Sequence, residues 1–493
     1  MKLSRMLGIA TLAVCAITTV SAQTWTPVQN VPNIAAGAVA LLTDGRVLVQ
    51  DVNTYTNWYT LTPDSSGNYA TGTWTQVATL PSGYGPLYNG AAVLPDGRYI
   101  IEGGEYNLGR DAWTTKGAIY DPVANTWTSV TPPSGWASIG DSPSVVLSNG
   151  TFMQSSCCDQ PPQAALLNAS TLTWTSTGSG KFDIYDEEGL TLLPGGMVLD
   201  VDAYVFSYNS AGKNYELYNP STGDWTSQGP TPEQYWDSAA NCGGENDASY
   251  ELGPAVLMPN MTVFQTGANS CAAGHNGVYN YAANTWTEAP DFPGTFDIAD
   301  GPAALEVNGN VMMFASPGIF NTGGQMFEWN GSALSELPNP PNGPGDSSYY
   351  GHLLMLPSGQ VMFTDFSNDV ELFTSAGSQY TGWTPTVIQT TAPSYQPGQT
   401  YRVAGTNFNG ASQDGAYGDD FQDATNYPLI RFTSVSTGDV YYAHTHNHST
   451  MAVGYHGPSY TYVDIPSTIP SGTYHLQVVV NGIASANYTV IIQ

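Results

Sequence analysis

Acidic and phenolic side chains recur at one position of a strand pair that this sequence repeats. The position lies eight residues before the second turn residue of each expected hairpin. Its occupants along the chain are Ala36, Tyr88, Asp141, Glu187, Leu252, Asp300 and Tyr350. Glu251 is the alternative to Leu252, because the sequence does not fix the register of that hairpin. Polar groups that converge in a concave site could bind a ligand, so the candidate ligand-binding residues are Tyr88, Asp141, Glu187, Asp300 and Tyr350.

Carboxylates brought to one opening repel one another. They need a bound cation, water, arginine partners or raised pKa values, and the chain contains few arginines. Oxygen ligands alone would favour calcium, whereas added imidazoles would favour copper or zinc. Asp186, Glu187 and Glu188 could instead hold an acid/base pair for glycoside hydrolysis. A further interpretation is that these side chains only hydrogen-bond to neighbouring loops.

Three of the seven histidines lie within five residues, at His444, His446 and His448. They follow an apolar and aromatic run, 440–443, that is typical of a β-strand. Alternation along a strand would place all three imidazoles on one face, where they could bind a transition metal. The alternative is that they pack within the C-terminal domain or its interface.

Four cysteines follow the N-terminal segment, and their spacing does not suggest a zinc site because no C-x-x-C pair is present. Cys242 and Cys271 flank one expected strand pair and are the predicted disulfide. Cys157 and Cys158 are adjacent, so they could form a vicinal disulfide or remain thiols. A second acidic group, with glycines nearby, lacks the spacing of an EF-hand and is predicted to be a solvated turn. It comprises Asp414, Asp419, Asp420 and Asp423.

The elements that must position these residues form a repeat. An apolar strand, a tight turn and a second apolar strand recur roughly every 50 residues, the period typical of kelch blades. The turns fall at 43–45, 95–97, 148–150, 194–196, 259–261, 308–309 and 357–359. They predict seven blades of a β-propeller over residues 23–385, with inner strands that surround a central tunnel.

An outer strand pair follows most of the hairpins and ends in tryptophan. The pattern is clearest from Tyr120 to Trp127, and we expect each such tryptophan to pack between neighbouring blades. A propeller must close to remove its sheet edges. The segment around Trp25 is predicted to complete the last blade, and Trp383 is the rival candidate for that place.

The pattern changes after Pro385. Residues 391–400 are rich in Thr, Pro, Ser and Gly, and six short alternating strands follow. They are expected at 401–404, 429–433, 440–444, 460–463, 475–480 and 488–492. About a hundred residues of this kind predict an immunoglobulin-like β-sandwich over 386–493.

The N-terminus and the overall charge favour an exported protein. Lys2 and Arg5 precede an apolar run, and Ser21-Ala22 supplies small residues for cleavage, which is the pattern of a signal peptide over 1–22. The formal net charge is −30, which disfavours nucleic acid and anionic lipid as partners. We therefore expect a secreted protein that does not insert in membranes, with a small-molecule or carbohydrate ligand and an association with the cell surface or matrix as a further option.

The repeat, the appended sandwich and one C-terminal segment together carry a family resemblance. The segment includes Asn407-Phe408-Asn409-Gly410, Tyr417-Gly418-Asp419-Asp420 and 426–431. The chain resembles the galactose oxidase and glyoxal oxidase family, and within it a branch of bacterial secreted kelch proteins. The resemblance implies a copper bound by two tyrosines and two histidines, with one tyrosine cross-linked to a cysteine.

Carried onto this chain, the resemblance implies Tyr88 and Tyr350 as catalytic residues and His352 as a copper ligand. A second imidazole would enter the tunnel from the C-terminal domain, at His444, His446 or His448. No inner strand begins with cysteine, so the sequence predicts a protein without an intact Tyr-Cys site. Three hypotheses follow: a binding protein for a carbohydrate or other polar ligand, a copper-dependent alcohol or aldehyde oxidase, and an extracellular scaffold.

Overall fold

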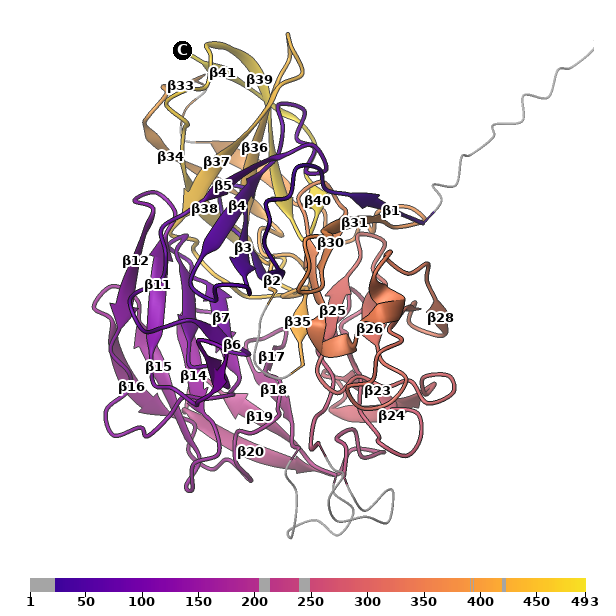
Figure 1. Ribbon diagram of the computed structural model, residues 1–493. Helices are drawn as coiled ribbons and strands as arrows, with labels where there is room; N and C mark the ends of the chain where they lie inside the picture. Colours follow the sequence, from indigo (N-terminus) through magenta and orange to yellow (C-terminus); the bar gives the residue numbers. More distant parts are fainter. Residues whose placement is uncertain (1–22, 204–212, 239–248, 391, 393, 419–422) are drawn as a thin grey trace, which may run out of the picture.

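The computed structural model describes residues 23–203, 213–238, 249–390, 392, 394–418 and 423–493 (Figure 1). The expected signal peptide, Cys242, Asp419 and Asp420 lie outside these residues. The regular structure in the described residues is β-strand apart from two single 3₁₀ turns, η2 (Gly343–Gly345) and η3 (Ser348–Tyr350). No helix in this part of the chain could cross a bilayer.

Seven antiparallel sheets, each built around four strands, follow one another along the described chain. Sheet 1 contains β2 (Ala36–Leu41), β3 (Val47–Asp51), β4 (Trp58–Thr62) and β5 (Thr73–Gln76). Sheet 2 contains β7 (Gly90–Val93), β8 (Tyr99–Glu102), β11 (Gly117–Asp121) and β12 (Thr126–Val130). Sheet 3 contains β13 (Ser144–Val146), β14 (Phe152–Ser156), β15 (Gln163–Asn168) and β16 (Thr173–Thr177). Sheet 4 contains β17 (Thr191–Leu192), β18 (Val198–Val201), β19 (Tyr215–Asn219) and β20 (Asp224–Gly229).

The remaining sheets repeat this order. Sheet 5 contains β21 (Ala255–Leu257), β22 (Thr262–Gln265), β23 (Asn276–Asn280) and β24 (Thr285–Ala289). Sheet 6 contains β25 (Pro302–Leu305), β26 (Val311–Ala315), β27 (Gln325–Trp329) and β28 (Leu334–Glu336). Sheet 7 contains β29 (His352–Met355), β30 (Val361–Thr364), β31 (Glu371–Thr374) and the N-terminal β1 (Thr24–Pro27). A small extra sheet joins β6 (Pro86–Leu87), β9 (Tyr106–Asn107) and β10 (Arg110–Asp111).

The first strands of the seven sheets form a closed ring. Each contacts the first strand of the next sheet, and β29 contacts β2. These strands are mostly apolar and buried, as in β7, because they are covered on both faces, whereas fourth strands such as β12 are largely exposed. Strand β1 pairs with β31 from Thr24↔Thr374 to Pro27↔Glu371, so the N-terminal strand occupies the place predicted for it.

Aromatic side chains fill the spaces between neighbouring sheets. Trp58 of sheet 1 packs against Trp127 of sheet 2 with ring centroids 5.6 Å apart. The Trp174 indole donates to the Thr131 carbonyl at 2.8 Å, and the Trp25 indole donates to that of Pro338 at 2.7 Å. These tryptophans pack between sheets as predicted, whereas Trp383 is buried and donates to Pro259.

The C-terminal segment forms a second β unit with its own apolar core. All six strands expected from the sequence lie within observed ones. The strands are β32 (Thr386–Thr390), β33 (Ser394–Tyr395), β34 (Thr400–Thr406), β36 (Leu429–Ser434), β37 (Val440–His446), β38 (Pro458–Asp464), β39 (Gly472–Val480), β40 (Ile483–Ala484) and β41 (Tyr488–Ile492). Val403, Phe432 and Leu476 are among the buried residues that form this core.

This unit covers the end of the ring that carries the hairpin turns (Figure 1). Thr445 donates its backbone N–H to the Thr43 carbonyl, His448 to that of Pro95, and Met451 to that of Ser148. Contacts with three successive turns fix the unit against sheets 1 to 3.

One segment leaves the C-terminal unit and enters the ring. Its strand β35 (Ala416–Tyr417) pairs with β25, and the Asp414 carboxylate accepts a bond from Leu305 N–H at 3.0 Å. Asp414 and Asp423 are only 2% and 1% exposed. The prediction of a solvated turn is therefore wrong for these two aspartates, because the segment passes through the centre of the ring instead of lying on the surface.

Candidate ligand-binding site

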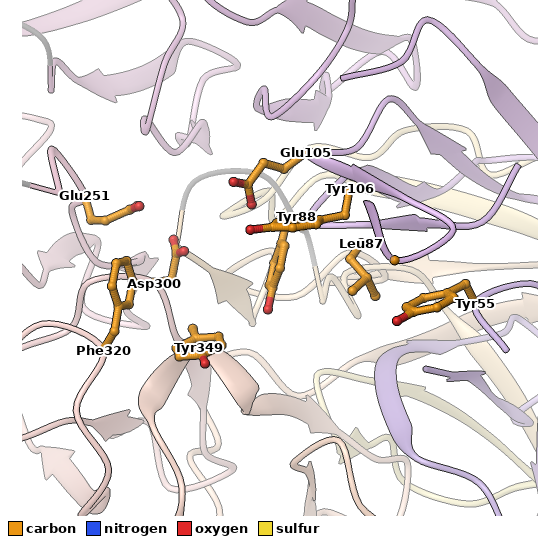
Figure 2. A pocket seen from close by; sticks show the side chains of 10 residues that line it. Tyr55, Leu87, Tyr88, Glu105, Tyr106, Glu251, Asp300, Phe320 and Tyr349 are labelled. Atoms are coloured by element: carbon orange, nitrogen blue, oxygen red, sulfur yellow. The ribbon is translucent and has the colours of Figure 1, made fainter. Parts of the chain in front are cut away.

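An open cavity of about 500 Å³ lies at the end of the ring away from the C-terminal unit. Figure 2 shows the side chains that line it. Loops that precede the first strand or follow the second strand of several sheets line it. Its lining residues are Tyr55, Leu87, Tyr88, Glu105, Tyr106, Gly109, Glu251, Asp300, Phe320 and Tyr349. Phenols and carboxylates therefore dominate the polar groups, and residues more than 200 positions apart become neighbours.

Three carboxylates meet at one side of this opening. Glu187, Glu251 and Asp300 each place an oxygen within 4.8 Å of the other two. They come from the loops before β17, β21 and β25, so three successive sheets contribute one acid each. Oxygen atoms at this spacing could coordinate a hard cation or accept hydrogen bonds from a hydroxylated ligand.

Tyr88 stands near the centre of the cavity, and the small extra sheet builds the wall behind it (Figure 2). Leu87 pairs with Tyr106 in this sheet, and the Tyr88 carbonyl accepts a bond from Glu105 N–H at 2.9 Å. The Tyr88 and Tyr106 rings meet edge to face at 5.9 Å. The Glu105 carboxylate raises the pKa of Tyr106, so this phenol stays neutral and keeps a hydroxyl to donate.

Tyr417 reaches the site from the segment that passes through the ring. Its ring stacks on Tyr88 at 6.1 Å and on His352 at 5.0 Å. Its hydroxyl donates to the Tyr349 carbonyl at 3.0 Å. Burial lowers the pKa of His352 to about 3, so the imidazole is neutral at ordinary pH. The C-terminal segment thus closes the floor of the cavity with an aromatic stack.

Several residues in or beside the cavity have a strained backbone. Of the eighteen non-glycine residues with positive φ in the described part of the chain, five lie here: Tyr55 (62°), Tyr88 (50°), Glu187 (58°), Asp300 (52°) and Phe320 (54°). This left-handed region is unfavourable for bulky side chains, and such residues cluster at functional sites. Gly109, with φ of 69°, lies against Tyr55, and a Cβ there would be 2.5 Å from the phenol oxygen. The loops are thus shaped to hold these side chains in place.

The structure gathers most of the residues expected from the repeat. Tyr88 and Asp300 line the cavity, Glu187 joins the carboxylate group, and Glu251 occupies the place left open in sheet 5. Leu252 instead packs with Ala203 and Trp236 in a small apolar cluster.

Two expected residues lie just outside the lining. Tyr349 faces the cavity in place of Tyr350, because the 3₁₀ turn η3 shifts the register before β29. The Tyr350 ring packs instead against Tyr349 at 4.3 Å and Phe366 at 5.5 Å. Asp141 is 8% exposed and lies close enough to Tyr106 to raise the pKa of that phenol.

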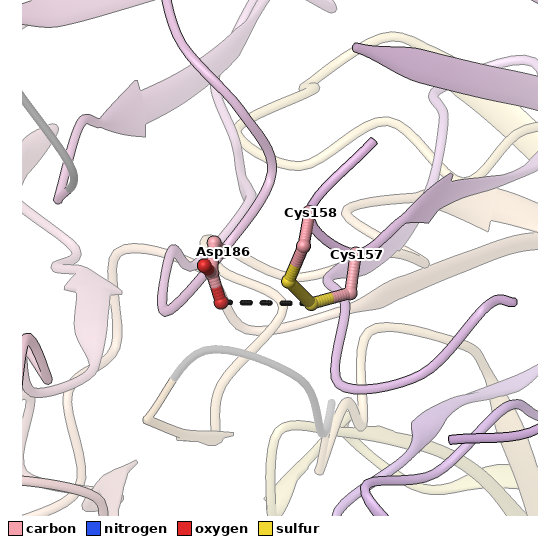
Figure 3. Close-up of side chains that lie close together, drawn as sticks. All are labelled: Cys157, Cys158 and Asp186. Carbon is pink, nitrogen blue, oxygen red and sulfur yellow. Dashed lines mark hydrogen bonds between the residues drawn. A yellow bond between two sulfur atoms is a disulfide. The ribbon is translucent and has the colours of Figure 1, made fainter. Parts of the chain in front are cut away.

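The run from Asp186 to Glu188 does not form an acid/base pair. Glu187 joins the cavity, whereas Glu188 lies 3.0 Å from the buried Lys181 ammonium. Asp186 lies 3.5 Å from the Cys157 sulfur (Figure 3). These three consecutive residues therefore have three different sets of contacts.

Cys157 and Cys158 form a vicinal disulfide, the first of the two options left open by the sequence. Cys157 N–H donates to the Ile139 carbonyl at 2.8 Å, and Cys158 N–H donates to that of Tyr185 at 3.2 Å. The pair therefore lies between the loops that carry Asp141 and Glu187. The Cys242–Cys271 disulfide stays a prediction, because Cys242 lies outside the described residues.

The histidines do not gather into one site. His352 is beside Tyr88 and Tyr417 in the ring. His444 and His446 lie on β37, outside the ring, with Asp464 between them at 3.1 and 3.3 Å. His448 is separated from them, because its buried ring meets Thr461 at 2.8 Å and stacks on Tyr427. The segment that enters the ring is 411–418, whereas the resemblance had implied the histidine run.

The described residues beside Tyr88 in the ring include one imidazole, whereas the copper ligand set implied by the resemblance includes two. His352 is the one imidazole that lines the space with Tyr88, among seven histidines that all fall in the described residues. Its ring is held between Tyr417 at 5.0 Å and Phe366 at 6.3 Å. Cys157 and Cys158 are bonded to each other, so neither sulfur is linked to a tyrosine.

Comparison with known proteins gives a likeness in fold. No family model and no curated protein matches the sequence. A solved structure described as a novel fungal alcohol oxidase with catalytic diversity among the AA5 family, in complex with copper, aligns with a TM-score of 0.53 at 12% identity, over 96% of this chain and 100% of that one. A structure described as YjhT aligns with a TM-score of 0.42 at 12% identity, over 64% of this chain and 99% of that one.

The chain therefore has an all-β, galactose oxidase-like fold. An identity of 12% supports a shared fold. The chemistry must be argued from the residues of the site, because one fold can carry many functions. The score of the second alignment is too low to add to this conclusion.

Several cavity residues were absent from the sequence prediction. Glu105 and Tyr106 lie on an inserted hairpin, and Tyr55 and Phe320 lie in loops after second strands. Equivalent positions in the inner hairpins could not reveal them, because these loops differ from sheet to sheet. Tyr417 lies in the segment that carried the family resemblance, and that signal could have identified it.

Proposed function

We propose that this protein binds a carbohydrate or a similarly polar, uncharged or cationic ligand at the mouth of its ring. The observation that carries the proposal is the open cavity of about 500 Å³ lined by phenols and carboxylates from several sheets. This volume suits one or two sugar rings. The formal net charge of −30 disfavours anionic ligands.

The side chains around the cavity suit the chemistry of a sugar. Aromatic faces such as those of Tyr88 and Phe320 can pack against the apolar C–H face of a pyranose ring. Carboxylates such as those of Glu251 and Asp300 can accept bonds from hydroxyl groups, often in pairs. The strained loops support this proposal, because they hold the side chains in position before the ligand arrives.

The scaffold that we propose is a secreted, seven-bladed kelch-type propeller followed by an immunoglobulin-like sandwich. The ring of seven sheets and the period of the hairpins support the propeller. The separate core of the C-terminal unit supports the sandwich. The residue pattern of 1–22 supports export.

We also propose that this chain lacks the copper-radical chemistry of the oxidases that it resembles. The support is the isolated position of His352 and the mutual bonding of Cys157 and Cys158. An oxidase with this site would need a second imidazole beside Tyr88. The two neighbouring imidazoles on β37 lie outside the ring instead.

A glycan array with the full chain tests the binding proposal. Wild type should bind at least one class of neutral glycan, and Tyr88→Ala and Asp300→Ala should lose that signal. Tyr488→Ala and Asp291→Ala are matched controls, because both residues are exposed and lie away from the cavity. Binding that survives both cavity changes, or no binding to any glycan, would reject the proposal.

A peroxide assay separates the binder from the oxidase. The copper-loaded chain is incubated with galactose, glyoxal and simple alcohols, and hydrogen peroxide is measured. We expect no turnover above that of free copper. Turnover that disappears in Tyr88→Phe and His352→Gln would establish the oxidase instead.

A further inference from the structure

We propose that His444, His446 and Asp464 form a binding site for a divalent transition-metal ion at the solvent-accessible edge of the contact between the C-terminal unit and the ring. The site is distinct from the ligand cavity. His444 lies against the turn at Gly97, which follows β7, whereas Tyr88 precedes that strand. The two sites therefore lie at opposite ends of the ring.

Strand pairing brings the three side chains together. His444 is opposite Asp464 in the antiparallel pair of β37 and β38, and His446 is two residues along the same strand. Residues opposite each other and residues two apart point to the same face of a sheet. The Asp464 carboxylate lies 3.1 Å from His444 Nδ1 and 3.3 Å from His446 Nε2, through different oxygens.

Neighbouring groups fix the orientation of all three side chains. Thr400 Oγ1 donates to one Asp464 oxygen at 2.5 Å. The His446 ring stacks on Tyr462 at 5.9 Å, and the two imidazoles stack on each other at 5.4 Å. A Cβ at Gly97 would lie 2.6 Å from His444 Nε2, so only glycine leaves room for this ring. Such support around the ligands is typical of metal sites.

The ligand set indicates the kind of ion. One oxygen or nitrogen of each residue lies within 4.8 Å of the other two. A bound ion could draw these three atoms closer together. Two imidazoles with one carboxylate favour zinc, copper, nickel or cobalt over calcium and magnesium. The side chains of His444, His446 and Asp464 are 15%, 19% and 42% exposed. Water can therefore complete the coordination, and an ion can enter from solvent.

Calorimetry on the chelator-treated full chain tests this site with Zn²⁺ alone. Wild type should bind one Zn²⁺ in this site, and His446→Ala and Asp464→Asn should each weaken that binding by about tenfold or more. His275→Ala is the matched control, because His275 makes a comparable 3.0 Å pair with Asp291 but has no third ligand among the described residues. Binding that is equal in all four proteins, or absent from wild type, would overturn the proposal.

Two further readouts guard against misfolded variants. Co²⁺ should give visible absorption bands in wild type and in His275→Ala but not in His446→Ala. Zn²⁺ should raise the thermal midpoint of wild type and not that of His446→Ala, because an ion that binds only the folded chain stabilises it. A thermal shift that is the same in the variant would contradict the assignment.

Discussion

At the scale of single residues, several carboxyl groups are buried in surroundings that favour their neutral form. Asp297 is fully buried and accepts a bond from Asn269 N–H at 3.2 Å. Burial raises the pKa of Asp297 to about 8, whereas an unfolded aspartate titrates near 4. The folded state therefore holds a proton that the unfolded state loses, and this contribution to stability is lost as the pH rises from about 4 to about 8.

Asp297→Asn should remove this pH dependence. Asparagine has the size of the protonated aspartate, so we expect similar stability at or below about pH 4 and higher stability than wild type at pH 8. The difference should grow by up to about 1.4 kcal/mol per pH unit across this range. Urea unfolding at several pH values measures it. Asp291→Asn, an exposed control, should run parallel to wild type, and parallel behaviour of Asp297→Asn would contradict the assignment.

The vicinal disulfide is also a feature of this scale. It closes the smallest possible loop, so its effect on the entropy of the unfolded chain is about 1 kcal/mol. Its backbone joins the loops that carry Asp141 and Glu187, so we expect it to affect the shape of the cavity more than the stability of the chain.

The double variant Cys157→Ser, Cys158→Ser should therefore stay folded but bind ligand more weakly. We expect the thermal midpoint to fall by only a few degrees, and the affinity for the best array glycan to fall by about tenfold. A chain that fails to fold, or that binds with unchanged affinity, would show that the disulfide acts on the scaffold alone.

At the scale of an element, sheet 4 is built around one buried lysine. Lys181 Nζ lies within 3.3 Å of five carboxylates, at Asp183, Glu188, Asp200, Asp202 and Glu216. Burial lowers the pKa of Lys181, but these carboxylates outweigh it and hold the pKa well above its usual range. Burial also raises the pKa of Asp200, to about 6, against the opposing effect of Lys181. A single ammonium thus holds β18 and β19 to the loop before β17.

Lys181→Met should destabilise the protein strongly. It keeps the length of the side chain but leaves five buried carboxylates without their cation, and breaking such a group costs about 3–5 kcal/mol. Lys213→Met removes a partly exposed pair with Glu233 at 3.2 Å and should cost less than about 1 kcal/mol. Chemical unfolding of both variants tests the difference, and equal losses would contradict this account of sheet 4.

The segment through the ring is the second element that matters for the site. Tyr417→Phe removes one hydrogen bond to the Tyr349 carbonyl and should cost about 1 kcal/mol. Tyr417→Ala also removes the ring between Tyr88 and His352 and should cost about 3–5 kcal/mol. Unfolding and glycan binding should both weaken more in the alanine variant. Equal effects of the two changes would mean that the ring itself contributes nothing.

At the scale of the whole molecule, most of the correct predictions about the fold came from the spacing of the hairpin turns. Their period placed the inner strands, and closure by the strand at Trp25 followed from the need to remove sheet edges. The same alignment located Tyr88, Glu187 and Asp300 at one opening, because equivalent positions in a closed ring must meet.

The rest depended on features that a period does not encode. The 3₁₀ turn before β29 places Tyr349 at the cavity instead of Tyr350. The inserted hairpin adds Glu105 and Tyr106 to the lining. The entry of 411–418 into the ring depends on long-range contacts such as that of Asp414 with Leu305. These contacts leave no local pattern in the sequence.

The central claim is that distant residues act together on one ligand, and a double-mutant cycle tests it most directly. Affinity for the best array glycan is measured for wild type, Tyr88→Phe, Asp300→Asn and the double variant. Each single change should weaken binding by about tenfold, the effect of one lost hydrogen bond, and the combined effect should depart from the sum by about 0.5 kcal/mol or more. Unchanged affinity in both single variants would show that the glycan binds elsewhere and would contradict the account.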